Sequence, residues 1–143
     1  MTGSNGFLGY QIQSTLNLVF DIITLNRSNS NVNCDIRNVI PVLPPVGIVI
    51  HAAAKAHSVP KTSMVSQAFF DVNFKGTNNL LQGLEKSQSI PKSFIFISSV
   101  AVYGRENGIN ISEDSPLLAE DPYGLSKIQA EQLVLEWCKT NNV

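Results

Sequence analysis

The sequence predicts an α/β fold, a doubly wound parallel sheet, on three observations. Segments with helical spacing alternate with short apolar runs that are typical of buried strands. Residues able to bind a ligand follow several of the expected strands, and sheets of this kind bind ligands at that edge. The chain has 143 residues, which is enough for one domain, residues 1–143, with its own core.

The composition excludes several classes of partner. Hydrophobic residues make up 43% and charged residues 15% of the chain, as in globular rather than disordered proteins. The net charge of -1 predicts no nucleic-acid partner, and no apolar run is long enough to span a membrane. Cys34 and Cys138 lie far apart and have no metal-ligand spacing, so we expect free thiols in a cytoplasmic protein and no metal site.

Residues 2–9 contain three glycines, Gly3, Gly6 and Gly9, at a spacing of three. Glycine has no Cβ, so a turn of this kind lets main-chain N–H groups approach a ligand. Residues 10–18 have helical spacing, and the N-terminus of that helix would present further N–H groups to the same ligand. The pattern indicates a pyrophosphate site, but a glycine turn without a ligand explains these residues equally well.

Two strands are expected next, over residues 21–26 and 32–36, because both stretches are rich in apolar and β-branched residues. Polar residues 27–31 would form the loop between them. Prolines within residues 41–45 exclude a long helix there. The apolar run at residues 47–51 then predicts a strand that is buried on both faces.

A long helix is expected over residues 63–86, and a further strand over residues 93–98. The apolar residues of that helix which we expect in the core are Phe69, Val72, Leu80, Leu81 and Leu84. Residues 104–121 have the composition of a loop. Pro122 suits the first turn of a last helix, over residues 122–139.

Tyr123 and Lys127 lie four residues apart, so on a helix they share one face. A cation near a phenol lowers its pKa from the usual value of about 10, which favours acid–base chemistry. A surface pair without function would have the same spacing. Ser99 follows an expected strand, where its hydroxyl could orient a substrate oxygen or cap main-chain groups.

These motifs occur in one order along the chain. They are the glycine turn, His51-Ala52-Ala53-Ala54, Asn73 with Gly76-Thr77, Ser98-Ser99 before Val102-Tyr103-Gly104, and Tyr123 with Lys127. This order resembles the extended short-chain dehydrogenase/reductase family, the NAD-dependent epimerase/dehydratase group that acts on nucleotide sugars. The resemblance covers nearly the whole chain and implies a Rossmann-type domain.

The resemblance implies which residues contact the cofactor. They are Gly3, Gly6, Phe7, Leu8, Gly9, Asn26, Arg27, Asp35, Ile36, Ala52, Ala53, Ala54, Asn73, Ser98, Tyr123 and Lys127. The glycine turn, with the main chain of the two residues after Gly6, would cradle the pyrophosphate. The Asp-Ile pair would flank the adenine, and the alanines would line the path to the nicotinamide ribose. Asn73 would support the site, either by contacting the cofactor or by capping buried main-chain groups.

The same resemblance implies that Ser99, Tyr123 and Lys127 are catalytic. Tyr123 would take a proton from a sugar hydroxyl while a hydride passes to the nicotinamide ring. Lys127 would hold the ribose and lower the pKa of the tyrosine, and Ser99 would bond the hydroxyl that is oxidised. Return of the hydride to the other face of the keto-sugar would give epimerisation.

Val100 and Ala101 follow Ser99, where dehydratases of this family have Asp-Glu. Neither side chain can move a proton, which disfavours dehydration, and the absence of the glutamate also disfavours decarboxylation. We therefore expect a nucleotide-sugar epimerase resembling UDP-sugar 4-epimerases. The alternatives are a keto-sugar nucleotide reductase or dehydrogenase and a dinucleotide-binding module without turnover.

Asn26 and Arg27 lie at the end of the strand expected over residues 21–26, which corresponds to the second strand of the family. An acidic residue at this place would indicate NAD. Asparagine does not repel a 2′-phosphate, and arginine could bind one. We expect NAD, from the resemblance to epimerases, with NADP as the alternative.

Only Met1 precedes Thr2, whereas members of this family begin with an apolar strand. We expect the chain to lack that first strand and the C-terminal substrate-binding part. The two long helices could pair in a homodimer. Lys55, His57, Glu113 and Asp114 are expected in solvated loops rather than in the site.

Overall fold

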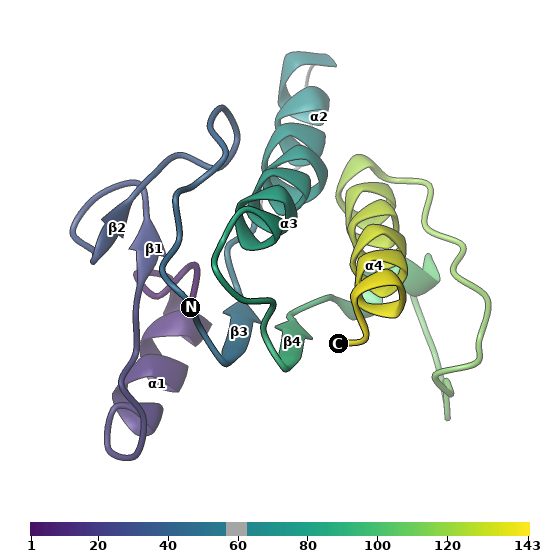
Figure 1. Cartoon of the computed structure of the whole chain (residues 1–143). Helices are drawn as coiled ribbons and strands as arrows, with labels where there is room; N and C mark the ends of the chain where they lie inside the picture. The colour runs from purple at the N-terminus through teal and green to yellow at the C-terminus, as the bar shows by residue number, and fades with distance from the viewer. Residues whose placement is uncertain (57–62) are drawn as a thin grey trace.

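The computed structural model describes residues 1–56 and 63–143 (Figure 1). The first half contains α1 (Phe7–Leu16), β1 (Leu25–Asn26), β2 (Val32–Asn33) and β3 (Ile48–His51). The second half contains α2 (Ser63–Phe69), the π-helical segment η1 (Phe70–Lys75), α3 (Gly76–Glu85), β4 (Ser93–Phe96), the 3₁₀-helix η2 (Val100–Tyr103) and α4 (Pro122–Asn141).

All strand pairs are parallel, as expected for an α/β fold. β1 pairs with β2, and β3 pairs with β4 in a register that places Val49 opposite Phe94. Thr2 lies between the two pairs and forms parallel bridges to both Leu25 and His51. Its N–H donates to the Ile50 carbonyl at 2.9 Å, and its carbonyl accepts from the Ala52 N–H at 3.3 Å. One residue thus occupies the central position of the sheet.

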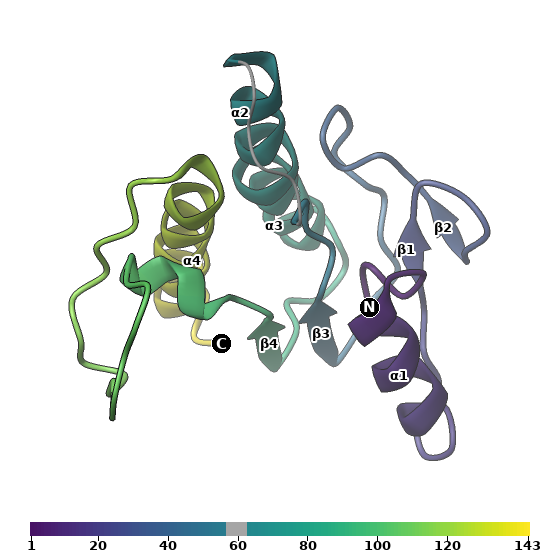
Figure 2. The ribbon, with the colours of Figure 1, turned by 180° about the vertical axis from the view of Figure 1, so that it is seen from behind.

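The core lies between the β3–β4 pair and the helices that cover one of its faces. α2–α3 and α4 lie side by side there in both views of the ribbon (Figures 1 and 2). The cluster includes Val49, Leu80, Leu84 and Trp137, and Phe94 packs against it. Alternate strand residues point to the other face, where about half of the surface of both Ile48 and Ile95 is exposed. Four of the five expected core residues are buried, and Val72 is half-buried.

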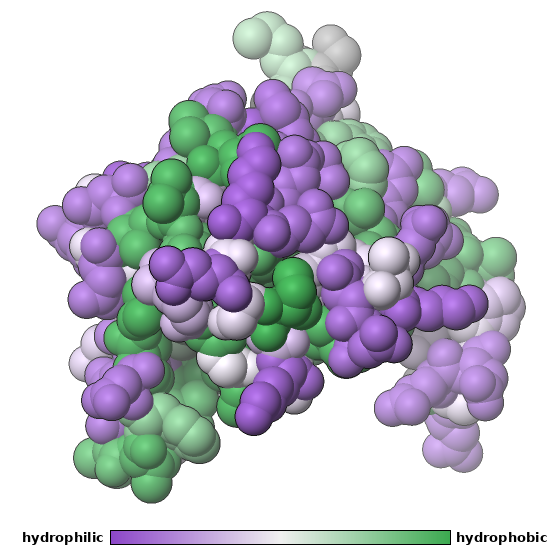
Figure 3. All heavy atoms as spheres, in the orientation of Figure 1, coloured by the Kyte–Doolittle hydropathy of each residue, from purple (hydrophilic) through white to green (hydrophobic). Residues whose placement is uncertain are grey.

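Apolar side chains are exposed at several places on the molecule, one of which is the end that carries α1. Figure 3 shows apolar side chains at the lower left, over the end of α1 and the loop that follows it. The exposed apolar residues of this loop are Leu18, Val19 and Phe20. Among the described residues no helix is long and apolar enough to cross a membrane, and no group of His, Cys, Asp and Glu side chains could hold a metal ion.

Several predicted boundaries are wrong. The first helix begins at Phe7 rather than residue 10, because Gly6 already has the extended conformation of an N-cap. The strand expected over residues 21–26 is reduced to Leu25–Asn26, since these are the residues of the stretch that pair with β2. The strands expected over residues 32–36, 47–51 and 93–98 are shorter as well, at Val32–Asn33, Ile48–His51 and Ser93–Phe96.

The helix expected over residues 63–86 is interrupted by η1. A π-helical turn holds an extra residue, and apolar periodicity in a sequence does not reveal it. The last helix continues two residues beyond the expected end at Lys139. It stops where Asn142 adopts the left-handed conformation, with φ 57°, a role in which asparagine is the usual substitute for glycine.

Candidate active site

A cavity of about 540 Å³ lies at the carboxyl ends of β1, β2 and β3. Nine of the residues expected to contact a cofactor line it: Gly3, Gly6, Asn26, Arg27, Asp35, Ile36, Ala52, Ala53 and Ala54. Parallel strands end at one edge of the sheet, which is why residues from distant parts of the chain meet here.

The glycine turn forms one wall of this cavity and depends on the absence of side chains. Gly3 has φ 72°, and a Cβ there would overlap the main chain of Ala52 and Ala53. A Cβ on Gly9 would overlap the Gly3 carbonyl oxygen, which accepts a bond from the Gly6 N–H at 3.0 Å.

The helix N-terminus beside this turn suits an anion. Gly6 is the N-cap of α1 and provides no side-chain cap, and the first turn contains no acidic residue. The Phe7 side chain is 90% exposed and therefore does not cover the N–H groups of the first turn. Uncapped N–H groups and the helix dipole favour a phosphate or pyrophosphate at this position.

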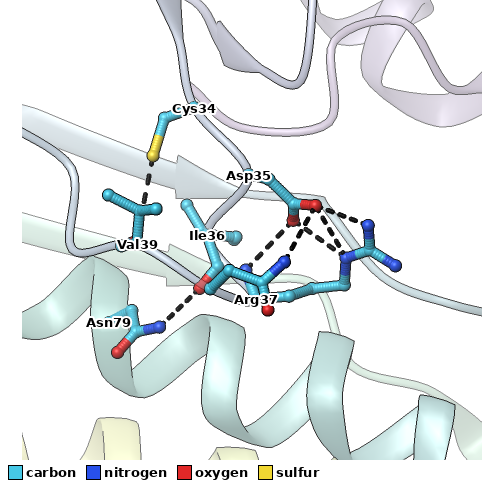
Figure 4. Close-up of polar contacts among 7 residues, drawn as sticks. Cys34, Asp35, Ile36, Arg37, Val39 and Asn79 are labelled. Carbon is cyan, nitrogen blue, oxygen red and sulfur yellow. Dashed lines mark hydrogen bonds and ion pairs between the residues drawn. The ribbon is translucent and has the colours of Figure 1, made fainter.

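The loop after β2 also lines the cavity, and Figure 4 shows its polar contacts. The Arg37 Nε donates to both carboxylate oxygens of Asp35, at 2.9 and 3.0 Å. These hydrogen bonds from Arg37 hold the pKa of the Asp35 carboxyl below its usual value, which keeps it ionised. The Ile36 carbonyl accepts from the Asn79 side chain at 2.6 Å, which ties the loop to α3.

Asn26 and Arg27 reach the cavity from β1. The Asn26 amide donates to the Ser4 hydroxyl at 2.8 Å, so this residue connects the strand end to the glycine turn. Within the described residues the only ion pair joins Arg37 to Asp35. Arg27 thus lines the cavity without a carboxylate bound to it.

Lys55 is held by Asn73 from the π-helical segment. The Asn73 side-chain oxygen accepts from the Lys55 N–H at 2.7 Å, and its amide nitrogen donates to the Lys55 carbonyl at 3.1 Å. Lys55 lies in a loop, as expected, and is half-buried, but it lines the cavity rather than lying away from it. Asn73 caps buried main-chain groups, one of its two expected roles. His57 lies outside the described residues.

The first turn of α4 carries Tyr123. Asp121 caps this helix by accepting from the N–H groups of Tyr123 and Gly124, both at 3.0 Å. The Tyr123 ring packs at 5.9 Å from the ring of Phe69, and the Lys55 ammonium lies 5.3 Å from the same Phe69 ring. Phe69 therefore connects the cavity wall to the expected catalytic tyrosine.

Lys127 is almost fully buried one helical turn after Tyr123. Its ammonium donates to the Ile97 carbonyl at 2.6 Å and lies 4.0 Å from the centre of the Phe96 ring. Burial lowers the pKa of Lys127 to about 8, and the charge of Glu131 opposes this shift. Lys127 is therefore less basic than an exposed lysine.

The two serines after β4 have different surroundings. The Ser99 hydroxyl accepts from the Ala101 N–H at 3.2 Å and caps η2, which is its expected structural role. The Ser98 hydroxyl is buried and has no hydrogen-bond partner among the residues that the structure describes. A buried polar atom without a partner indicates a place for a ligand group, so Ser98 fits the expected cofactor site.

Only part of the predicted site lines the cavity. Phe7, Leu8, Gly9, Asn73, Ser98, Ser99, Tyr123 and Lys127 are not among the residues that line the cavity. Sequence reasoning missed further lining residues, among them Asn5, Ser28, Arg37, Lys55 and Ala68. Arg37 and Lys55 directly follow residues that were predicted, and that adjacency was the available signal.

A buried polar cluster surrounds His51 at the end of β3. Its Nδ1 lies 2.6 Å from the Thr2 hydroxyl, and its Nε2 lies 2.9 Å from the Thr77 hydroxyl. Burial, and to a smaller extent the charges of Lys127 and the N-terminus, lower the pKa of His51 to about 3. His51 is therefore neutral at pH 7.

Comparison with known proteins shows the family of the chain. Residues 1–143 match the model of the NAD dependent epimerase/dehydratase family. The chain belongs to this family. It is 33% identical, over 96% of its length, to N-acetyl-alpha-D-glucosaminyl-diphospho-ditrans,octacis-undecaprenol 4-epimerase of Escherichia coli O157:H7. It is 32% identical, also over 96% of its length, to GDP-6-deoxy-D-mannose reductase of Pseudomonas aeruginosa.

Solved structures of family members share the Rossmann fold. MoeE5 in complex with UDP-glucose and NAD matches 96% of the chain with a TM-score of 0.81 and 25% identity. RMD from Pseudomonas aeruginosa complexed with NADPH matches 98% with a TM-score of 0.73 and 28% identity. Structural neighbours in this family thus hold NAD or NADPH. The chain spans 42% and 46% of the two relatives and 48% of each of these structures.

Gly9→Ala tests the glycine turn. The added methyl group would overlap the Gly3 carbonyl oxygen, so the turn must move and cofactor affinity should fall at least tenfold. Gly47→Ala is the matched control, because a Cβ at Gly47 meets no atom within 4 Å. Titration of both variants with NAD and NADPH measures the effect. Equal affinity in the two variants would contradict this account of the turn.

The pKa of His51 predicts a loss of stability in mild acid. The unfolded chain takes up a proton near the ordinary pKa of 6.5, whereas the folded chain keeps His51 neutral down to about 3. The free energy of unfolding should therefore fall as the pH decreases below 6.5, by at most about 1.4 kcal/mol per pH unit. Urea unfolding of a His57→Gln variant between about pH 7 and 5 leaves His51 as the only histidine that titrates, and a flat profile would refute the prediction.

Proposed function

We propose that this chain is the cofactor-binding domain of an NAD(P)-dependent nucleotide-sugar epimerase that resembles UDP-sugar 4-epimerases. One observation carries the proposal: the cavity at the edge of the parallel sheet is lined by the glycine turn, the Asp35-Ile36 pair and the alanine run. The relative from Escherichia coli O157:H7 is a 4-epimerase, and a UDP-glucose 4-epimerase of Vibrio cholerae is 31% identical to the chain.

NAD(P), when bound, would supply the site that accepts a hydride from the sugar and returns it. The uncapped N-terminus of α1 would bind its pyrophosphate, and the small alanine side chains would leave room for it. Tyr123 would remove the proton from the sugar hydroxyl. Ser99 accepts a bond from a main-chain N–H, and its own hydroxyl hydrogen can still be donated to that sugar oxygen.

Lys127 would act on the ribose and on the Tyr123 phenol. Both side chains belong to the first turns of α4, four residues apart and therefore on one helix face. The Ile97 carbonyl accepts one of the three ammonium hydrogens, which leaves two for other acceptors. With its pKa lowered to about 8, Lys127 is still mainly charged at pH 7 and can stabilise a phenolate.

A keto-sugar nucleotide reductase is the second candidate, and it would use NADPH. The neutral Asn26 and the unpaired Arg27 at the cavity favour a cofactor with a 2′-phosphate. The GDP-6-deoxy-D-mannose reductase relative and the RMD structure with NADPH also support a reductase that uses NADPH. For either candidate, we also propose that the protein is cytoplasmic and that two chains pair through α2–α3 and α4.

Cofactor consumption separates these candidates. An epimerase should convert a UDP-sugar with catalytic amounts of NAD, because the hydride is returned in each cycle. A reductase should oxidise one NADPH for each keto-sugar that it reduces. Chromatography of the sugar nucleotide together with absorbance of the reduced cofactor measures both. Cofactor binding without conversion by either route would leave a binding module and contradict the enzymatic proposal.

Tyr123→Phe tests the proposed acid–base residue. Loss of the phenol oxygen should lower turnover by about two to four orders of magnitude and leave cofactor affinity nearly unchanged. Tyr10→Phe is the matched control, since Tyr10 is 62% exposed on α1 and does not line the cavity. The turnover of both variants is compared with that of the unaltered protein, in the sugar-nucleotide assay described above. Near-normal activity of Tyr123→Phe would exclude the assigned role.

A further inference from the structure

The polar cluster around His51 extends well beyond this residue. The Ala53 N–H, on the cavity wall, donates to the Thr2 hydroxyl at 3.1 Å. Thr2 is bonded to His51 and His51 to Thr77, and the Thr77 hydroxyl donates to the Asn73 carbonyl at 2.6 Å. The side chains of Thr2, His51 and Thr77 are at most 2% exposed. Water therefore does not compete for these hydrogen bonds.

The direction of every bond in this series follows from its last acceptor. The Asn73 carbonyl has no hydrogen, so the Thr77 hydroxyl must donate to it, and His51 must donate to Thr77 from Nε2. A neutral imidazole has a single N–H, which leaves Nδ1 as an acceptor. The Thr2 hydroxyl must therefore donate to Nδ1, and its oxygen accepts from the Ala53 N–H. Every donor in the series has one acceptor.

A second series starts from the Asn73 side chain. Its amide nitrogen donates to the Ser126 hydroxyl at 2.9 Å, and Ser126 donates to the main-chain carbonyl of Tyr123 at 2.7 Å. The same side chain holds Lys55 by both main-chain groups. Asn73 thus joins the alanine wall of the cavity to the first turn of α4.

We propose that His51 is a positioning residue, a neutral Nε2–H imidazole whose one-directional hydrogen-bond series holds Asn73, and through it Lys55 and Tyr123, in register with the cofactor cavity. The π-helical segment contributes to this arrangement, because the carbonyl and the side chain of Asn73 both belong to it. Only the functional meaning of Tyr123 rests on the proposed function. The bond directions and the hold on Lys55 do not depend on it.

Thr77→Val removes the hydroxyl with little change in volume, leaves the His51 N–H without its partner, and removes the side-chain bond to the Asn73 carbonyl. A buried group that loses its partner is costly, so hydrogen exchange of the Lys55 amide should become about tenfold faster. The dissociation constant for NAD should rise by about the same factor, although Thr77 does not line the cavity. Thr77→Ser keeps the hydroxyl and should restore both values to within about twofold.

Thr140→Val is the matched control. Thr140 donates to the carbonyl four residues before it, as Thr77 does. Its bond to the Glu136 carbonyl is exposed, whereas Thr77 is buried and bonded to His51. This variant should leave Lys55 exchange and NAD affinity unchanged. A folded Thr77→Val chain with unchanged Lys55 exchange would overturn the proposal. If the unaltered chain does not bind NAD, the proposed function fails while the Lys55 measurement still decides this inference.

Two further measurements apply if Thr77→Val does not fold. Ser126→Ala interrupts the second series and should speed Lys55 exchange by about the same factor, because the Asn73 side chain loses one of its partners. In the unaltered chain with ¹⁵N-labelled histidine, NMR at pH 7 should find the His51 proton on Nε2 and none on Nδ1. A proton on Nδ1, or a charged ring, would overturn the assignment, as would unchanged Lys55 exchange in Ser126→Ala.

Discussion

The arrangement of the whole chain depends on Thr2. Its main chain pairs with Leu25 on one side and His51 on the other, and so joins the β1–β2 pair to the β3–β4 pair. Its side chain accepts from Ala53 and bonds to His51. The next residue, Gly3, begins the glycine turn. Strand pairing, the buried polar series and one cavity wall therefore meet at a single position.

Two further connections organise the site around this position. Asn26 joins the end of β1 to Ser4, and Asn73 joins Lys55 to the start of α4. The Asn26 amide donates to Ser4, whereas the Asn73 amide both donates and accepts and therefore links two segments of the chain. The cavity and the helix that carries Tyr123 are connected by Asn73, by the packing of Phe69, and by the contacts of α2 and η1 with α4.

Much of the cavity was predictable because it depends on local chemistry. The glycine spacing, the Asp-Ile pair and the alanine run all follow strands, and parallel strands bring their carboxyl ends to one edge. The hydrogen-bond partners were not predictable. Nothing in the sequence near Lys55 indicates that Asn73 is its partner, because the bond between them spans 18 residues of sequence. Asn73 in turn depends on a π-helical turn that leaves no mark on apolar periodicity.

The sequence by itself determined the order of helices and strands, the parallel class of the sheet and the chemical types of residue at its edge, since these follow from periodicity, glycine positions and side-chain chemistry. Only the tertiary structure decided the lengths of the strands, because a strand extends only as far as a neighbour pairs with it. It also decided that His51 is neutral and Lys127 less basic than usual, because desolvation depends on which residues surround a side chain once the chain has folded.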